Sequence, residues 1–206
     1  AAAARAGLGF FGKNTNLIVP RRGSWLSTLY SWPMIALWLL FGAILCAGIG
    51  VLAALLGDRT RRVAHLALAV GFRGIVRSHP FCTFSITGAE RLPPGPAILC
   101  PNHQSITDVV YLYSLPIHFK WVIRKQVFKL PVFGTFMRFI GYVPIDRDGA
   151  TELLAEVAET LRSGVPVVNF PEGTRSRSGE LGRFRTGAAR MAVASQVPLV
   201  PIAITG

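Results

Sequence analysis

The chain is poor in cysteine. Its 206 residues include only Cys46, Cys82 and Cys100, with no C-x-x-C pair. An odd and widely spaced set of this kind indicates neither a disulfide framework nor a zinc site. We therefore expect no bound metal, and we expect a reducing compartment.

Acidic side chains are also scarce: ten Asp and Glu stand against 22 Lys and Arg, a formal net charge of +12. A basic protein of this kind attracts either nucleic acid or acidic lipid. Two features favour lipid, namely a hydrophobic content of 51% and the absence of any charged side chain from residue 23 to residue 57. The predicted partner is the lipid bilayer, and no nucleic acid is expected.

The uncharged segment exceeds the ~20 apolar residues that a membrane-spanning helix needs. A spanning helix and a helix buried near the interface both fit it. Arginines flank both ends, so the positive-inside rule does not set an orientation. Apolar and basic residues then mix from 61 to 76, as in an amphipathic surface helix. We predict membrane-anchoring helices over residues 25–78.

A histidine and a carboxylate, His103 and Asp108, lie five positions apart. A histidine can accept a proton from an alcohol when a carboxylate holds its other ring nitrogen. On one continuous helix the two would lie about 140° apart. Ser105, three residues before Asp108, suggests a capping box, with His103 on the loop and Asp108 in the first helical turn. The alternative is that Asp108 only caps the helix and His103 is structural.

A second motif follows some sixty residues later. The apolar run 164–170 has the length of a strand, and Pro171-Glu172-Gly173-Thr174-Arg175 ends it abruptly. Loops at the ends of buried strands are where α/β sheets build their sites. Gly173 permits close backbone approach, Thr174 offers a hydroxyl, and Arg175 offers a planar fork that suits phosphate oxygens. The alternative is a strand-ending turn with a solvated arginine.

Two further segments complete a set of four. Residues 139–149 are predicted to form a short strand running into a polar turn that delivers Arg147, a second candidate phosphate ligand. Residues 197–206 are predicted to form another apolar strand, in which Pro201 favours an edge or bulge position. In order and spacing, the blocks at 103–108, 145–147, 170–176 and 197–204 resemble the four motifs of the 1-acylglycerol-3-phosphate (lysophosphatidate) acyltransferase family. The resemblance covers roughly residues 79–206.

This resemblance implies an enzyme that transfers a fatty acyl group from acyl-CoA or acyl-carrier protein to lysophosphatidate, giving phosphatidate for phospholipid biosynthesis. His103 would match the general base and Asp108 its orienting partner. The acceptor phosphate would be bound at a pocket lined by Arg147, Glu172, Gly173, Thr174 and Arg175. Asn102 and Lys125 are further candidates, Asn102 for orienting the histidine and Lys125 for adding charge near the phosphate. No cofactor is implied beyond the acyl co-substrate, and the chain has no G-x-S-x-G nucleophile motif.

Two alternatives remain open on the sequence. The acceptor could be glycerol-3-phosphate or another lysolipid, or the chain could be a non-catalytic membrane scaffold of the same fold. We expect membrane association in either case, at the inner (plasma) membrane with the catalytic part on its cytoplasmic face.

The two ends of the chain differ from the family pattern. Residues 1–25 resemble an internal fragment of the epoxyqueuosine reductases, which use cobalamin and iron–sulfur clusters, yet the cysteine runs for such clusters are missing. We interpret residues 1–24 as an extraneous or flexible segment. Gly206 closes directly on the last motif strand, so we expect the catalytic domain, residues 79–206, to be truncated at its C-terminus.

The catalytic part alternates strands and helices, which predicts an α/β fold with a mixed sheet flanked by helices. The expected strands are 82–87, 97–100, 120–123, 141–145, 165–170 and 199–204. The expected helices are 107–114, 127–139, 150–163 and 186–194.

Overall fold

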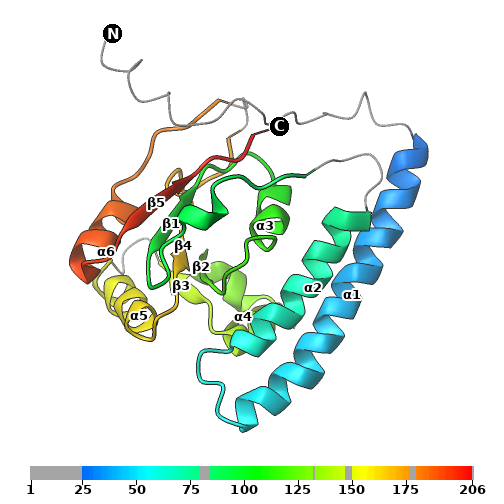
Figure 1. The fold of residues 1–206 in the computed structure, drawn as a ribbon, viewed down its shortest axis with the longest axis horizontal. Coiled ribbons are helices and arrows are strands. Elements are labelled where there is room, and N and C mark those ends of the chain that lie inside the picture. The colour runs from blue at the N-terminus through cyan, green and yellow to red at the C-terminus, as the bar shows by residue number, and fades with distance from the viewer. Residues whose placement is uncertain (1–24, 79–83, 132, 147–149, 177–179, 206) are drawn as a thin grey trace.

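The protein folds as a three-layer α/β structure preceded by a helical hairpin (Figure 1). The computed structural model describes residues 25–78, 84–131, 133–146, 150–176 and 180–205. The segment resembling epoxyqueuosine reductase and Arg147 lie outside these described residues. The predicted limits of the anchoring and catalytic parts stay predictions, because residues 79–83 at their junction also lie outside this set.

The central sheet has five strands in the order β3-β2-β4-β1-β5. These are β1 (Ile98–Pro101), β2 (Lys120–Arg124), β3 (Val143–Ile145), β4 (Val167–Val168) and β5 (Leu199–Ile202). Every pairing between them is parallel, with Leu99 opposite Val168 on β4 and opposite Val200 on β5. Their carboxyl ends therefore lie along one edge of the sheet.

The sheet is buried on both faces, as parallel sheets usually are. Alternate residues of one strand point to opposite faces. Ile98 and Val167 accordingly pack against α5 (Ala150–Arg162) and α6 (Gly187–Ser195), whereas Leu99 and Val168 pack on the other face. That second face is covered by α2 (Arg62–Ser78), α3 (Thr107–Leu112) and α4 (Phe133–Ile140).

The N-terminal hairpin consists of α1 (Trp25–Leu55) and α2, which run side by side in opposite directions (Figure 1). Helix α1 is long and apolar enough to cross a membrane. Much of its surface is exposed: Trp25 is 73% accessible, Leu37 67% and Leu55 79%. Exposed apolar area of this extent is unfavourable in water and indicates contact with lipid or with protein.

Helix α2 belongs to the same core as the sheet. Its Ala64 and Leu68 join the hydrophobic cluster that contains Phe119 and Trp121. The imidazole of His65 is buried there and stacks on Tyr113 at 5.2 Å. Burial lowers the pKa of His65 to about 2, so the ring is neutral at pH 7. The hairpin is thus fixed to the α/β part of the protein by side-chain packing as well as by the chain connection.

The α/β prediction with flanking helices is confirmed, with three differences of detail. The sheet is parallel in all its described pairings, where a mixed sheet was expected. Residues 84–87, the described part of the first expected strand, are not a strand. The helix expected over 127–139 is divided into a 3-10 turn, Lys125–Lys129, and α4, because Pro131 has no N–H to continue a helix and clashes with the preceding turn. Pro201 lies on the edge strand β5, as predicted.

Close packing of the hairpin predicts a stability effect at Gly71. A Cβ on this residue would lie 2.6 Å from the carbonyl oxygen of Trp38 and 3.0 Å from the Cα of Gly42. Gly71→Ala must therefore push α1 and α2 apart, at a cost of about 1–3 kcal/mol. We expect a lower thermal midpoint for the detergent-solubilised variant, measured by circular dichroism.

Gly48→Ala on α1 is the matched control, because a Cβ there meets no atom within 4 Å. Alanine favours helix more than glycine does, so this variant should melt at the wild-type temperature or slightly above it. Equal midpoints for the two variants would contradict close packing at Gly71.

Candidate active site

The site lies at the carboxyl edge of the parallel sheet. His103 follows the end of β1, and the loop 169–176 follows the end of β4, its neighbour in the sheet. Arg124 ends β2, on the other side of β4. Because the carboxyl ends of parallel strands meet at one edge, segments distant in sequence come together here.

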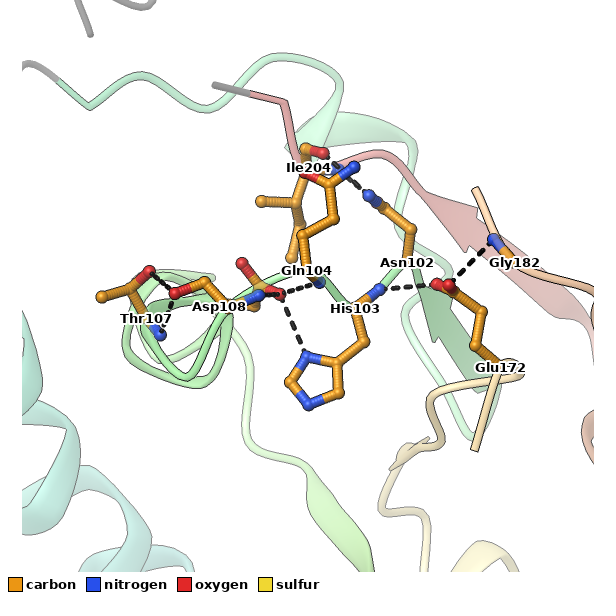
Figure 2. Close-up of polar contacts among 9 residues, drawn as sticks. Asn102, His103, Gln104, Thr107, Asp108, Glu172, Gly182 and Ile204 are labelled. Atoms are coloured by element: carbon orange, nitrogen blue, oxygen red, sulfur yellow. Dashed lines mark hydrogen bonds and ion pairs between the residues drawn. The ribbon is translucent and has the colours of Figure 1, made fainter. Parts of the chain in front are cut away.

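His103 and Asp108 form the predicted pair. The Nδ1 atom of His103 lies 3.0 Å from Oδ2 of Asp108 (Figure 2). His103 is on the loop before α3 and Asp108 is in the first turn of that helix, so the predicted convergence across the helix start is confirmed. A carboxylate only accepts hydrogen bonds, so Nδ1 carries the proton and Nε2 keeps its lone pair.

The Asp108 carboxylate also organises the loop. Its Oδ2 accepts the backbone N–H groups of Gln104 at 2.7 Å and Ser105 at 2.8 Å. The bond from Ser105 is the returning half of the expected capping box. Ser105 Oγ accepts the N–H of Thr107 at 3.3 Å, so the other half of the box is displaced by one residue. Capping the helix and holding the imidazole are therefore done by one oxygen, and the two interpretations of Asp108 are compatible.

Glu172 holds the peptide of His103. Its Oε1 accepts the His103 N–H at 2.7 Å, and its Oε2 accepts the Gly182 N–H at 3.0 Å (Figure 2). The carboxylate is buried in these contacts. Both oxygens of Glu172 thus accept backbone N–H groups in the structure, and its expected place in the lining of a phosphate pocket stays a prediction.

The same loop holds the other side of the His103 peptide. The Ser176 N–H donates to the carbonyl oxygen of His103 at 2.8 Å. The imidazole ring stacks on Phe170, with the ring centres 3.9 Å apart and the planes 16° apart. Sequence analysis gave Phe170 and Ser176 no role. Their places at the two ends of the second motif were the only available signal.

Asn102, the candidate for orienting His103, uses its side-chain amide on Ile204 in the structure. Its amide nitrogen donates to the carbonyl of Ile204 at 2.9 Å, and its amide oxygen accepts the Ile204 N–H at 2.7 Å (Figure 2). Both polar atoms of the side chain are thereby engaged with the backbone beyond β5. These two hydrogen bonds link the end of β1 to the segment that follows the edge strand β5, and they stabilise the start of the loop that carries His103.

The predicted phosphate ligands lie beside this arrangement. Gly173 has φ +71°, a left-handed conformation that favours glycine. Thr174 and Arg175 follow it with exposed side chains. Lys125 lies at the end of β2, with its ammonium 3.8 Å from the carboxylate of Asp146. Thr174 and Arg175 thus lie in the loop between Glu172 and Ser176, the two residues that bond the His103 peptide.

A cavity of about 2,300 Å³ opens at His103. Its polar end includes His103, Thr174 and Arg175, and the remainder is largely apolar. The apolar lining comes from α1, α2, α3, β2 and α4, with the following side chains among others: Leu39, Val51, Leu68, Phe72, Val109, Trp121, Phe136 and Met137. A volume of this size and character accommodates a long hydrocarbon chain next to the histidine. Among the described residues, no three His, Cys, Asp or Glu side chains are grouped so that they could hold a metal ion.

Comparison with known proteins decides the family. A family model described as Acyltransferase matches residues 83–205, more than half of the chain. The chain belongs to the acyltransferase family. The resemblance inferred from the four motifs is thereby confirmed at the level of the family.

Acyltransferase relatives include a chloroplastic 1-acyl-sn-glycerol-3-phosphate acyltransferase of Brassica napus, 38% identical over 157 residues, which cover 74% of this chain and 45% of the relative. A 1-acyl-sn-glycerol-3-phosphate acyltransferase of Pseudomonas aeruginosa is 30% identical over 124 residues, 58% of this chain and 48% of the relative. This chain spans about half the length of the curated relatives it matches.

A solved acyltransferase structure shares the fold. It is the 1-acyl-sn-glycerophosphate acyltransferase PlsC from Thermotoga maritima, with a TM-score of 0.62 and 25% sequence identity. The match covers 88% of this chain and 74% of the PlsC chain. It therefore extends beyond the residues of the family model.

Proposed function

We propose that this acyltransferase transfers a fatty acyl group from an acyl-CoA or acyl-carrier-protein thioester to the free hydroxyl of lysophosphatidate, forming phosphatidate. One observation carries the proposal: the His103–Asp108 pair stands where an apolar cavity meets the loop of Thr174 and Arg175. A lysophosphatidate has the matching three parts, a hydrocarbon chain, a hydroxyl and a phosphate. The names of the relatives support the same acceptor.

The chemistry follows from the free nitrogen of His103. Nε2 removes the proton of the acceptor hydroxyl as its oxygen attacks the thioester carbonyl. Asp108 stabilises the imidazolium that forms. When the tetrahedral intermediate collapses, the C–S bond breaks, the ester C–O bond remains, and the leaving thiolate takes the proton from the imidazolium. Acyl transfer is complete without a covalent enzyme intermediate or a cofactor.

The hairpin suggests how the lipids arrive. Leu39 and Val51, twelve residues apart on α1, line the same cavity as His103. This half of α1 therefore lies along the catalytic part, which favours a helix embedded in one leaflet over a helix that crosses the bilayer. The apolar cavity would then open toward the acyl chains of that leaflet. We propose the inner (plasma) membrane with the catalytic part at its cytoplasmic face, where acyl-CoA and acyl-carrier protein are available.

The test is acyl transfer by detergent-solubilised protein, with labelled acyl-CoA or acyl-carrier protein and with lysophosphatidate and glycerol-3-phosphate in parallel. Phosphatidate formed from lysophosphatidate alone is the expected result. Product from glycerol-3-phosphate alone would contradict the proposed acceptor. A folded protein that binds lysophosphatidate and forms no product with either donor would contradict the proposed activity and favour a scaffold.

A further inference from the structure

Three aromatic rings stack in series across neighbouring strands of the sheet. The His103 imidazole stacks on the ring of Phe170, with the centres 3.9 Å apart and the planes 16° apart. The Phe170 ring stacks in turn on the indole of Trp121, at 5.4 Å and 24°. Trp121 is on β2, Phe170 follows β4 and His103 follows β1, and these strands are neighbours in the sheet. The proposed base is therefore one end of a ring series whose other end is Trp121.

Trp121 is the rigid end of this series. It lies opposite Val168 in the register of β2 and β4. Because alternate residues share a face, Phe170 continues on the side of the sheet that Trp121 occupies. Trp121 is only 4% accessible and belongs to the larger hydrophobic cluster. Phe170 and His103 are only partly buried, so the indole is the member of the series that the core holds in place.

The hydrogen bond to Asp108 does not by itself fix the plane of the His103 ring. It holds one ring atom, Nδ1, at 3.0 Å from Oδ2 of Asp108. Carbonyl-type oxygens accept hydrogen bonds over a broad range of directions, so the ring can still tilt about this contact. The tilt moves Nε2, and a misplacement of about 1 Å can cost on the order of 10² in rate. Flat stacking on Phe170 opposes the tilt only as far as Phe170 itself is held.

We propose that Trp121 is a positioning residue for the base, and that through Phe170 it fixes the tilt of the His103 imidazole and hence the direction of Nε2. This inference rests on the proposed function, which makes His103 the base. Trp121 also lines the cavity, so a change there can alter substrate binding as well. Kinetics separate the two effects, because a misdirected base lowers kcat whereas a lost wall contact raises KM.

The first experiment compares Trp121→Leu and Trp121→Phe with the wild-type protein. Leucine keeps an apolar side chain and removes the flat ring, whereas phenylalanine keeps a ring that can stack. Loss of a stacked aromatic pair should lower kcat of Trp121→Leu by about threefold to tenfold, with the KM for lysophosphatidate within about twofold. Trp121→Phe should keep kcat within about twofold of wild type. A raised KM with kcat unchanged in Trp121→Leu would make Trp121 a wall of the cavity only and refute the proposal.

Phe128→Leu is the matched control. Phe128 is buried in the same hydrophobic cluster and lies outside the cavity. In the described part of the chain its ring contacts neither Trp121 nor Phe170. This variant should melt at a lower temperature than wild type and keep its kcat within about twofold.

A double variant tests whether the effect passes through Phe170. In a Phe170→Leu background, Trp121→Leu should cause no further loss of kcat, because the contact that it acts through is already gone. A further loss as large as that of Trp121→Leu alone would refute the series.

A measurement without turnover keeps this inference separate from the proposed activity. The chain has four histidines, so a spectrum of protein labelled with ¹³C in the histidine rings is simple, and His103→Ala identifies the His103 signal. Protons stacked over an aromatic ring are shielded, so this signal should lie upfield and should move downfield in Trp121→Leu but not in Phe128→Leu.

The combined results decide between the two proposals. The expected shift in a wild-type protein without turnover would uphold the ring series and refute the activity. Wild-type turnover, with kcat and the His103 signal unchanged in Trp121→Leu, would refute the series and leave the activity standing. If Trp121→Leu fails to fold, Trp121→Met takes its place, because methionine fills irregular core space without a flat ring.

Discussion

His103→Ala should reduce kcat for acyl transfer by roughly 10²- to 10⁴-fold, the contribution typical of a positioned general base. The physical reason is the lone pair on Nε2, which Asp108 keeps available by taking the Nδ1 proton at 3.0 Å. The His103 side chain is held by that bond and by stacking on Phe170. Phe170 packs against the larger hydrophobic core, but His103 itself belongs to neither core cluster. The variant should therefore stay folded. Initial rates at saturating acyl donor would measure kcat, and a circular-dichroism melt would check that the variant is folded.

Asp108→Asn extends this test to the tautomer of His103. The asparagine amide can donate to Nδ1, which would move the ring proton to Nε2 and abolish the base. A loss of activity similar to that of His103→Ala is expected. A His103→Ala protein that melts normally and keeps kcat within about threefold of wild type would exclude His103 as the base.

Glu172→Gln should have the second-largest effect. Both Glu172 oxygens accept backbone N–H groups, from His103 and from Gly182. A glutamine amide has one oxygen and one NH2 group, so one of the two N–H groups must face another donor. An unsatisfied buried group costs about 1–3 kcal/mol. If that cost displaces the His103 peptide, kcat falls by roughly 5- to 150-fold, measured as initial rates at saturating lysophosphatidate.

Two companion variants sharpen the interpretation of Glu172→Gln. Gly182→Ala leaves the charge in place but brings a Cβ to within 2.8 Å of Glu172 Oε2, so it should lower kcat in the same direction. Glu152→Gln on α5 changes an exposed glutamate and should leave activity unchanged. If Glu172→Gln raised the KM for lysophosphatidate with kcat intact, the residue would belong to the phosphate pocket after all.

Sequence patterns were sufficient where the signal is local. The alternation of apolar strands and amphipathic helices predicted the α/β fold, and the spacing of His103 and Asp108 predicted that they converge across a helix start. Both depend on residues a few positions apart, whose geometry is set by helix and strand periods. Pro131 was also a local signal, and it was overlooked because the apolar run continues on both sides of it.

The parts that sequence reasoning missed depend on contacts between distant loops. Asn102 was assigned to its sequence neighbour His103, yet it bonds Ile204. Glu172 was grouped with Arg175 by adjacency, although its carboxylate turns toward the His103 backbone. Arg124 reaches the Gly173 carbonyl because β2 and β4 are neighbours in the sheet. These contacts depend on which strands are neighbours in the sheet. A single sequence motif does not show the strand order, so it could not predict them.

The His103 peptide is bonded twice by the loop that follows β4, once through its N–H group and once through its carbonyl oxygen. The backbone that carries Thr174 and Arg175 is fixed to His103 at both ends, by Glu172 before them and by Ser176 after them. A ligand that steadies these two residues therefore also steadies the base. Binding energy from the part of the acceptor that does not react can thus lower the barrier of the step that does. On the proposed function, an acceptor phosphate bound at this loop would therefore assist the reaction as well as hold the acceptor in place.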